Sequence, residues 1–174
     1  MNISLNADKI ASIIDDLVRQ ITSDIPADAN VAIIGIRSRG EILAQRLKAK
    51  LGDHFSESLL HGTLDITLYR DDLNEPKDTQ PTVRSTEIEF DVTDKLILLV
   101  DDVLHTGRSV RAAMDALTDM GRPRMVRLAV LVDRGQHEYP ICADYVGIKE
   151  VVDADKTVRV HFTETDNEDR VFVE

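Results

Sequence analysis

The chain lacks most of the features that mark secreted, membrane-spanning or disordered proteins. Cys142 is the one cysteine among 174 residues, which excludes an internal disulfide and is typical of the reducing cytoplasm. We expect Cys142 to be a small buried hydrophobe. No apolar run exceeds five residues, the length of Leu96 to Val100, so no membrane span is predicted. Residues 1–8 carry no basic region followed by an apolar block, so we expect no secretory signal.

Basic charge is also scarce. The sequence holds 21 Lys and Arg against 32 Asp and Glu, for a net charge of −11. Because proteins that bind nucleic acid through its phosphates usually carry a basic surface, this charge argues against nucleic-acid binding as the principal activity. From Asp144 onward there are nine acidic residues against four basic ones. We interpret this acidic C-terminal region as a solubilising surface.

The length and the apolar spacing predict one globular domain over residues 1–174, in which helices and strands alternate. Helices are expected from Ala7 to Ile25 (capped by Asn6 or Asp8), from near Gly40 to Leu51, and from Val110 to Leu117. Strands are expected at Val31 to Ile34, Gly62 to Tyr69, Leu96 to Val100 and Met125 to Val132, and more weakly at Val158 to Phe162 and Val171 to Val173. This pattern predicts an α/β fold with a doubly wound, mainly parallel sheet, whose ligands bind beyond the carboxyl ends of the strands.

The polar segment from Arg70 to about Asp91 interrupts this alternation. It contains Pro76 and Pro81 and shows no sustained apolar spacing. A loop of this length inside a compact domain is usually functional or mobile. We therefore expect a flexible hood that becomes ordered when a ligand binds.

The strand that ends at Val100 leads into the segment Asp101-Asp102-Val103-Leu104-His105-Thr106-Gly107-Arg108-Ser109. Thr106, Gly107 and Ser109 let backbone N–H groups approach an anion, and the N-terminus of the next helix adds a favourable field. The two acids repel phosphate, so we expect them to be solvated and to face sugar hydroxyls or a metal ion. An acid pair beside a phosphate cradle suits a sugar phosphate.

Acid pairs at a strand end also occur in receiver-type signalling domains, where they hold magnesium and accept phosphate. Asp101 and Asp102 alone fit both interpretations equally well. The small and hydroxyl-bearing residues from Thr106 to Ser109 favour the phosphate cradle, because they follow the acids immediately and run into a helix.

A second loop, Gly35-Ile36-Arg37-Ser38-Arg39-Gly40, joins a buried strand to a helix. Two arginines at a helix N-terminus face the positive end of the helix dipole, which disfavours them as merely solvated side chains. The planar guanidinium group makes paired, charge-assisted hydrogen bonds to phosphate oxygens. The loop therefore predicts an anion site on the same sheet edge as the acid pair.

The segment from Val100 to Ser109 resembles the signature of type I phosphoribosyltransferases, which bind 5-phosphoribosyl 1-pyrophosphate (PRPP). Leu64 to Leu73, Arg108 to Leu117 and Leu128 to Gly135 resemble the pyrimidine operon regulators of that family, which are uracil phosphoribosyltransferases and RNA-binding attenuators. The likeness runs from the first helix to about Gly147. It implies the type I fold, Mg²⁺ as cofactor, PRPP and uracil as substrates, UMP as product, and a cytoplasmic homo-oligomer.

The resemblance also implies a role for each residue of the two loops. Asp101, Asp102 and Arg39 would be catalytic, and the two acids would contact the ribose hydroxyls directly or through Mg²⁺. The loop that holds the ribose 5-phosphate would continue through Val103, Leu104 and His105 to the cradle Thr106, Gly107, Arg108 and Ser109. Arg37, Ser38 and Arg39 would meet the pyrophosphate, Arg70 and Arg84 would close over it, and Arg134 and Val158 would lie beside the uracil. We assign His105 no role as a general base.

One region departs from the family pattern. Lys149 to Lys156 carries carboxylates where the family has hydroxyl and basic groups, which counts against binding of an mRNA leader. Arg122, Arg124 and Arg127 are the candidates for a remaining RNA-binding patch. Three functions stay open: a uracil phosphoribosyltransferase, an RNA-binding regulator with little catalysis, and a phosphoribosyltransferase for a purine or orotate.

Overall fold

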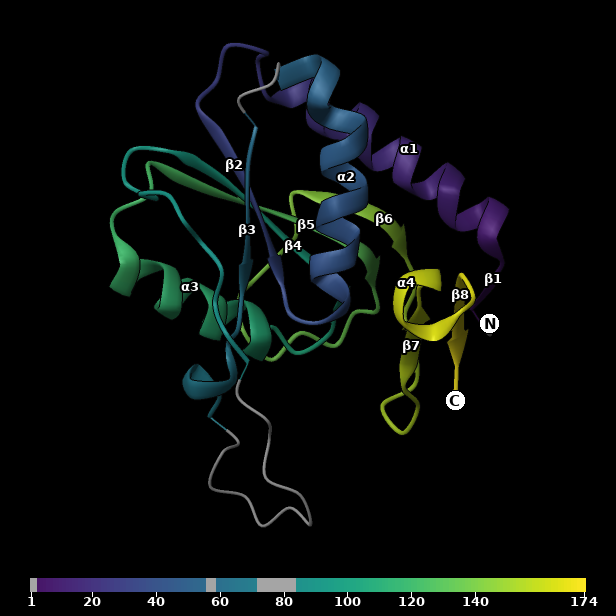
Figure 1. Ribbon diagram of the computed structural model, residues 1–174. Helices are drawn as coiled ribbons and strands as arrows, with labels where there is room; N and C mark the ends of the chain where they lie inside the picture. The colour runs from purple at the N-terminus through teal and green to yellow at the C-terminus, as the bar shows by residue number, and fades with distance from the viewer. Residues whose placement is uncertain (1–2, 56–58, 72–83) are drawn as a thin grey trace.

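A computed structural model describes residues 3–55, 59–71 and 84–174 of the chain (Figure 1). Five parallel strands form its main sheet in the order β3-β2-β4-β5-β6. They are β2 (Val31–Ile36), β3 (Leu60–Leu64), β4 (Leu96–Leu104), β5 (Met125–Asp133) and β6 (Tyr145–Lys149). The expected α/β fold with a parallel sheet is confirmed.

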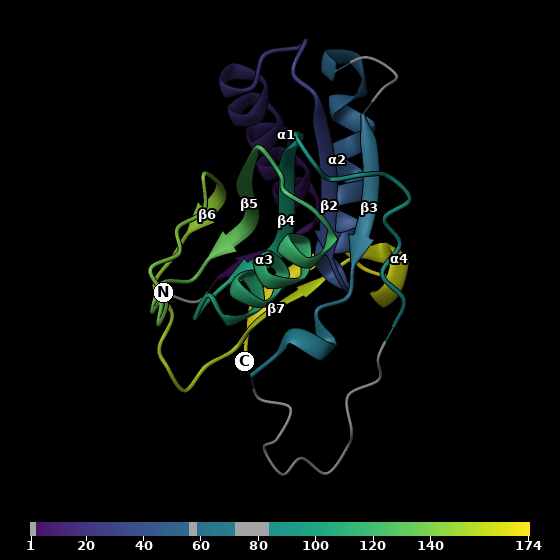
Figure 2. The ribbon, with the colours of Figure 1, turned by 90° about the vertical axis from the view of Figure 1, so that its left-hand side faces the viewer.

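Helices cover both faces of the sheet, as Figure 2 shows. The helices α1 (Ala7–Asp24) and α2 (Arg39–Phe55) share one apolar cluster, and α3 (Arg108–Met120) belongs to a second cluster. The strand β2 supplies both clusters in alternation, because Val31 and Ile33 pack in the first cluster and Ala32 and Ile34 in the second. Burial on both faces explains why this strand is a continuous apolar run in the sequence.

The strand order places the switch point of the sheet between β2 and β4. From β2 the chain crosses by way of α2 to β3 on one side, and β4 then pairs with β2 on the other side. At such a point the connections leave in opposite directions and open a crevice beyond the carboxyl ends of the strands. Arg37 and Ser38 follow β2, and Asp101 and Asp102 lie in β4, so both predicted loops border this crevice.

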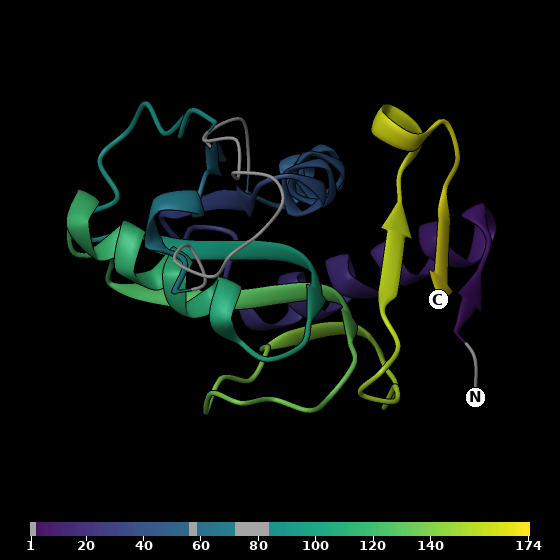
Figure 3. The ribbon, with the colours of Figure 1, turned by 90° about the horizontal axis from the view of Figure 1, so that it is seen from below.

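A smaller antiparallel sheet of order β1-β8-β7 stands beside the main one (Figure 3). It joins β1 (Ser4–Leu5), β7 (Val158–His161) and β8 (Arg170–Val173), and the short helix α4 (Thr163–Asp166) connects β7 to β8. Phe162, which lies between β7 and α4, is fully buried in the cluster shared with α1 and α2. The N- and C-terminal segments are thereby fixed to the core as one sheet.

Several predictions of detail are wrong. The expected strand Gly62 to Tyr69 ends at Leu64, and a 3-10 turn, η2 (Thr67–Tyr69), follows it. The strand β6 had no counterpart in the expected elements, whereas the two weak C-terminal strands are confirmed as β7 and β8, in the small sheet. Cys142 is exposed rather than buried, because it lies in the irregular connection before β6.

The segment expected to form a hood falls largely on residues 72–83, which lie outside the described residues. Of its remainder, Glu87 forms an antiparallel bridge with Thr63 of β3. Within the described parts of the chain, no helix is both long and apolar enough to cross a membrane.

Candidate active site

The carboxyl ends of β2 and β4 border a cavity of about 280 Å³. Its lining includes eight residues that the sequence predicts for the site: Arg37, Ser38, Arg39, Arg70, Asp101, Asp102, Val103 and Ser109. It also includes four that were not predicted: Ile36, Asp65, Ile66 and Thr67. The two loops and the start of the Arg70 segment therefore meet at one place, at the switch point of the sheet.

The acid pair lies inside β4, so the strand extends further than its apolar run. Asp101 is 7% exposed, so the expectation of a solvated acid is wrong for Asp101, whereas Asp102 is half-buried. The Oδ1 atom of Asp101 accepts a hydrogen bond from the N–H of Asp102, at 3.0 Å. Burial and the charge of Asp102 raise the pKa of Asp101 well above its ordinary value, and burial also raises the pKa of Asp102. The two carboxyl groups therefore form a site in which the charged forms are disfavoured unless a cation is bound.

Gly40 determines how closely α2 approaches this pair. A Cβ atom at Gly40 would lie 2.7 Å from the Val100 carbonyl oxygen and 2.9 Å from the Cα of Asp101. No side chain fits in this space, so the first turn of α2 packs directly on β4. The glycine after Arg39 is therefore explained by packing, in addition to any contact with an anion.

The turn from β4 into α3 has the form of a phosphate cradle. Gly107 is the N-cap of α3 with a φ of +89°, a left-handed conformation that glycine adopts without strain. The Thr106 hydroxyl oxygen accepts a hydrogen bond from the N–H of Arg108 at 3.3 Å, and the Thr106 carbonyl oxygen accepts from the N–H groups of Glu138 and Tyr139. The turn is thus held by the segment after β5, next to the N-terminus of a 13-residue helix.

The side chain of Arg108 is engaged elsewhere. It forms ion pairs with Asp71 at 2.6 Å and with Glu138 at 2.7 Å, and its guanidinium group lies over the ring of Tyr139. Two carboxylates offset its charge, so the backbone of the turn and the hydroxyl of Ser109 are the better candidates for phosphate donors.

The two arginines of the other loop both line the cavity, and both are also paired with acids of the protein. The guanidinium of Arg37 forms ion pairs with Glu41 at 3.2 Å and with Glu87 at 2.8 Å. The Nη2 atom of Arg39 lies 2.7 Å from Asp166, while its Nε atom is buried and has no hydrogen-bond partner among the described residues. The Arg39 side chain is nevertheless 37% exposed, so part of its guanidinium group remains accessible to a bound anion.

A second cavity of about 440 Å³ adjoins the first. Its lining consists of Arg39, Asp102, Val158, Arg159, Val160, His161, Phe172 and Glu174. Arg39 and Asp102 line both cavities and form their common wall. The predicted residue Val158 is here, but the other residues of β7 and β8 were missed, because short strands with only weak alternation gave no sign of facing a site.

Asp65 is another residue that the sequence analysis missed. Its Oδ1 accepts hydrogen bonds from the N–H and hydroxyl groups of Thr67, and its Oδ2 accepts from the N–H of Arg84. Burial alone would raise the pKa of Asp65, but these hydrogen bonds lower it below its ordinary value. The spacing Asp-x-Thr, typical of a turn closed by a carboxylate, was the available signal.

Three predicted residues contribute less directly than expected. The Leu104 side chain is buried in the core, and Leu104 offers only its backbone, whose carbonyl accepts from the N–H of Arg134. Arg134 is itself buried at 3% exposure and donates to the carbonyl oxygens of Asp153 and Lys156, so it holds the β6–β7 connection and lines neither cavity. Burial, together with the charge of Arg134, lowers the pKa of His105, which keeps this imidazole neutral at pH 7.

The acid pair fits a magnesium ion that arrives with a phosphorylated substrate. Mg²⁺ in such sites is held by one or two carboxylates together with water and substrate phosphates. Among the described residues, no group of three or more His, Cys, Asp or Glu could hold a metal ion without a ligand. Two carboxyl groups with raised pKa values, one buried and one half-buried, would be stabilised in their charged form by a divalent cation.

Comparison with known proteins decides between the open interpretations of the acid pair. The model of the phosphoribosyl transferase domain matches residues 4–165. The chain belongs to the phosphoribosyltransferase family. It is therefore a glycosyltransferase of the phosphoribosyl-transferring type, and the receiver-domain interpretation is excluded.

Curated relatives of this phosphoribosyltransferase carry the name Bifunctional protein PyrR. The one from Deinococcus radiodurans is 47% identical over 167 residues, which cover 96% of this chain and 91% of the relative. One from Bacillus cereus is 50% identical over 145 residues, which cover 83% of this chain and 81% of the relative.

Solved structures agree on the fold. The hypoxanthine phosphoribosyltransferase of Trypanosoma cruzi matches with a TM-score of 0.70 at 17% identity, covering 97% of this chain and 93% of that one. A purine phosphoribosyltransferase from Pyrococcus horikoshii matches with a TM-score of 0.62 at 22% identity, covering 84% and 85%. At these identities the likeness supports the type I phosphoribosyltransferase architecture and no choice of base.

Proposed function

We propose that this phosphoribosyltransferase transfers the ribose 5-phosphate group of PRPP to uracil, which yields UMP and pyrophosphate. The observation that carries the proposal is the acid pair of the buried Asp101 and the half-buried Asp102 beside the turn Thr106–Ser109, in a chain whose relatives at 47–50% identity share the name PyrR. The choice of uracil is supported by the segments that resemble the pyrimidine operon regulators, Leu64 to Leu73 and Leu128 to Gly135.

The proposed roles follow from the charges of the reaction. Breaking the bond from ribose C1 to pyrophosphate creates a cation-like sugar and a strongly anionic leaving group. Arg39 and Ser38 would bind the leaving group, the turn Thr106–Ser109 would hold the 5-phosphate, and Asp101 and Asp102 would hold the ribose hydroxyls. When it is bound at Asp101 and Asp102, Mg²⁺ would supply positive charge against the developing pyrophosphate.

The second cavity supports a place for the base. It adjoins the first at Arg39 and Asp102, so a group bound there would lie next to a ribose held by the acid pair. Its walls combine the buried apolar side chains Val158 and Val160 with the polar side chains of β7 and β8. A flat heterocycle with polar edges suits such a mixed surface.

The wider setting is part of the same proposal. We place the reaction in a single phosphoribosyltransferase-like domain over residues 1–174, in the cytoplasm, and in a homo-oligomer of two or more copies. One cysteine, and that one exposed, needs no oxidising compartment.

The test is a phosphoribosyl-transfer assay with PRPP and Mg²⁺ in which uracil, orotate, hypoxanthine and guanine are offered in parallel. Uracil should give UMP with a kcat/KM at least tenfold above that of every other base. A purine or orotate as the best acceptor would refute the uracil assignment and leave the family assignment intact.

Regulation by RNA binding is a second proposed function, supported by the word "bifunctional" in the relatives' name. The candidate residues Arg122, Arg124 and Arg127 surround the start of β5, at the amino ends of the strands and thus opposite the active site. Arg127 already pairs with Asp144 at 2.7 Å, so Arg122 and Arg124 would carry most of the binding. The distance from the active site predicts that this patch and catalysis can be altered separately.

Titration of the upstream pyrimidine leader RNA at two salt concentrations, with and without UMP, tests this second function. Replacement of all three arginines by alanine should weaken binding and flatten its salt dependence by about two in the logarithmic slope, while uracil transfer is retained. A regulator that senses UMP requires coupling between the two sites, so UMP should shift the RNA affinity and RNA should shift the UMP affinity by the same factor. Absence of binding at low salt would leave an enzyme without the regulatory function.

A further inference from the structure

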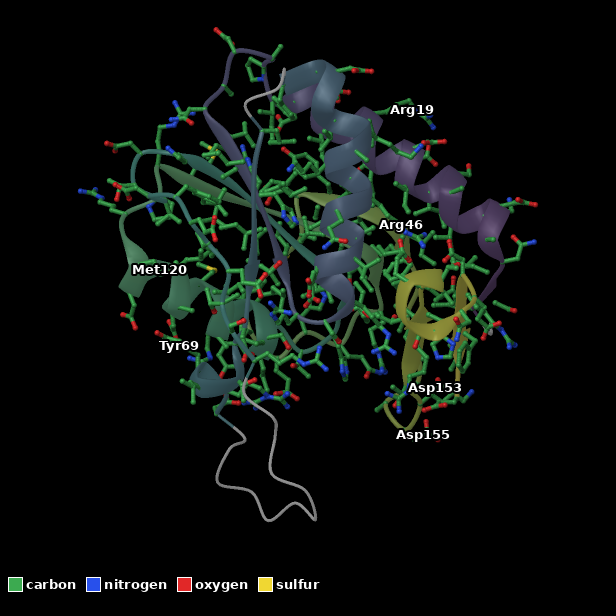
Figure 4. All side chains as sticks on the ribbon, viewed as in Figure 1. Arg19, Arg46, Tyr69, Met120, Asp153 and Asp155 are labelled. Atoms are coloured by element: carbon green, nitrogen blue, oxygen red, sulfur yellow. The ribbon has the colours of Figure 1, made fainter. Side chains whose placement is uncertain are left out.

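Two arginines of α2, Arg39 and Arg46, both pair with acids at the turn between β7 and β8. Arg39 forms an ion pair with Asp166 at 2.7 Å. Arg46 forms ion pairs with Glu164 and Asp169, each at 2.6 Å, and Figure 4 shows it between α2 and α4. Three of the acids in the C-terminal region are therefore bound to α2, so a merely solubilising surface is the wrong interpretation for them.

The two arginines have different surroundings. The guanidinium of Arg46 lies 4.6 Å from the centre of the buried Phe162 ring and lines neither cavity of the site. Arg39 lines both cavities together with Asp102. The Arg46 contacts thus fasten the small sheet to the core, whereas the Arg39 contact reaches the site.

Asp166 is itself held firmly. Its Oδ2 accepts hydrogen bonds from the N–H of Phe162 at 3.0 Å and from the hydroxyl of Thr165 at 2.8 Å, which leaves Oδ1 for Arg39. Asp166 is 14% exposed, and its hydrogen bonds, with the charge of Arg39, lower its pKa to about 2 despite its partial burial. A charged oxygen is therefore held in a defined position next to the Arg39 guanidinium at neutral pH.

We propose that Asp166 is a positioning residue for phosphoribosyl transfer: it holds the Arg39 guanidinium in the wall between the two cavities. Only the Nη2 atom of Arg39 is used in this ion pair, and the side chain is 37% exposed, so part of its guanidinium group remains accessible to the leaving pyrophosphate. A long side chain that is already fixed binds a developing anion without losing further conformational freedom. The inference rests on the proposed function and assigns the small sheet a part in catalysis.

The test compares Asp166→Asn with the matched control Asp169→Asn. Both acids lie in the same turn, accept backbone N–H groups and pair with an arginine of α2 at 2.6–2.7 Å. Asp166→Asn should lower kcat/KM for PRPP about tenfold and leave the KM for uracil unchanged. Asp169→Asn should lower the unfolding temperature similarly and leave kcat/KM for PRPP within twofold. Equal losses of kcat/KM in the two variants would overturn the proposal.

A coupling measurement separates positioning from stability. In an Arg39→Gln background, Asp166→Asn should lower kcat/KM for PRPP by less than twofold, because the side chain that it positions is gone. A further tenfold loss there would contradict the proposal. If Asp166→Asn does not fold, Asp166→Glu takes its place: the charge is kept but displaced, and kcat/KM for PRPP should still fall several-fold. A wild-type value for Asp166→Glu would equally contradict it.

Calorimetric binding of PRPP with Mg²⁺ keeps this inference distinct from the choice of base. If the wild type binds PRPP but transfers it to no base offered, the proposed function fails. The inference about Asp166 is then still supported if Asp166→Asn lowers the affinity for PRPP and Asp169→Asn does not. If both variants bind PRPP like the wild type, the positioning role is refuted even where uracil transfer is confirmed.

Discussion

Two pairs of aspartates in this protein show how surroundings decide what a carboxylate does. Asp101 and Asp102 lie in β4, where burial and mutual repulsion raise the pKa of Asp101, and neither forms an ion pair within the described residues. Asp166 and Asp169 lie near α4, where arginine partners and backbone N–H groups lower both pKa values to about 2. Because Asp101 and Asp102 have no ion-pair partner among the described residues, they suit a bound ligand. Asp166 and Asp169 already have arginine partners and need no ligand.

The largest expected effect is the loss of turnover when the charges of Asp101 and Asp102 are removed. Asp101→Asn combined with Asp102→Asn should lower turnover about a thousandfold or more, roughly 4 kcal/mol of transition-state stabilisation, because the ribose and Mg²⁺ lose their charged partners. Initial rates of UMP formation, together with a circular dichroism spectrum of the variant, measure this. Full activity in the folded double variant would end the catalytic assignment.

A smaller effect, on stability, is expected at Gly40, where α2 packs against the backbone of the acid pair. Gly40→Ala would place a Cβ atom 2.7 Å from the Val100 carbonyl oxygen, so α2 must shift and the free energy of unfolding should fall by about 1–3 kcal/mol. Gly52→Ala is the matched control in the same helix, since no atom lies within 4 Å of a Cβ there. That change should be neutral or stabilising by up to about 1 kcal/mol. Urea unfolding of the two variants measures this difference. If Gly52→Ala were the less stable of the two, the packing argument would be contradicted.

The stability contributed by Asp169 should depend on pH. Because the folded-state pKa of Asp169 is about 2, below the ordinary value of 3.8, its contribution to stability is present above about pH 4 and is lost as the pH falls towards 2. At pH 7, Asp169→Asn should therefore be less stable than the wild type by about 1–2 kcal/mol. The difference should disappear near pH 2. Urea midpoints at pH 7, 4 and 2.5 check this, and a difference independent of pH would assign the effect to packing.

The smallest expected effect is an increase in stability when the charges of Asp101 and Asp102 are removed. The pKa of Asp101 is raised in the folded state, so this residue favours folding at low pH and disfavours it as the pH rises through the folded-state pKa. At pH 7, Asp101→Asn combined with Asp102→Asn should raise the unfolding temperature by a few degrees. The variant would be more stable and nearly inactive. A lower unfolding temperature at pH 7, with the gap unchanged at pH 4, would show that the acids stabilise the apoprotein instead.

The sequence predicted the strands β2, β4 and β5 of the main sheet, because strands buried on both faces appear as continuous apolar runs, and the helices, because an amphipathic helix shows a single apolar stripe. The edge strands β3 and β6 lack such runs, so β3 was placed with the wrong bounds and β6 was missed. Both loops of the site were found because they follow such runs directly. The small sheet was only partly predicted, since its strands of two to four residues depend on pairing between the two ends of the chain. The ion pairs of Arg39 and Asp166 were out of reach for the same reason, as 127 positions separate the two residues.

The most direct measurement is a carboxyl-carbon NMR titration of aspartate-labelled protein, without ligand and then with PRPP and Mg²⁺. Without ligand, Asp101 should titrate well above the ordinary value of 3.8, while Asp166 and Asp169 titrate near 2. On addition of PRPP and Mg²⁺ the apparent pKa of Asp101 should fall, and those of Asp166 and Asp169 should stay near 2. If Asp101 instead had an ordinary pKa that PRPP and Mg²⁺ left unchanged, the claim that the substrate and its metal ion bind to Asp101 and Asp102 would be contradicted.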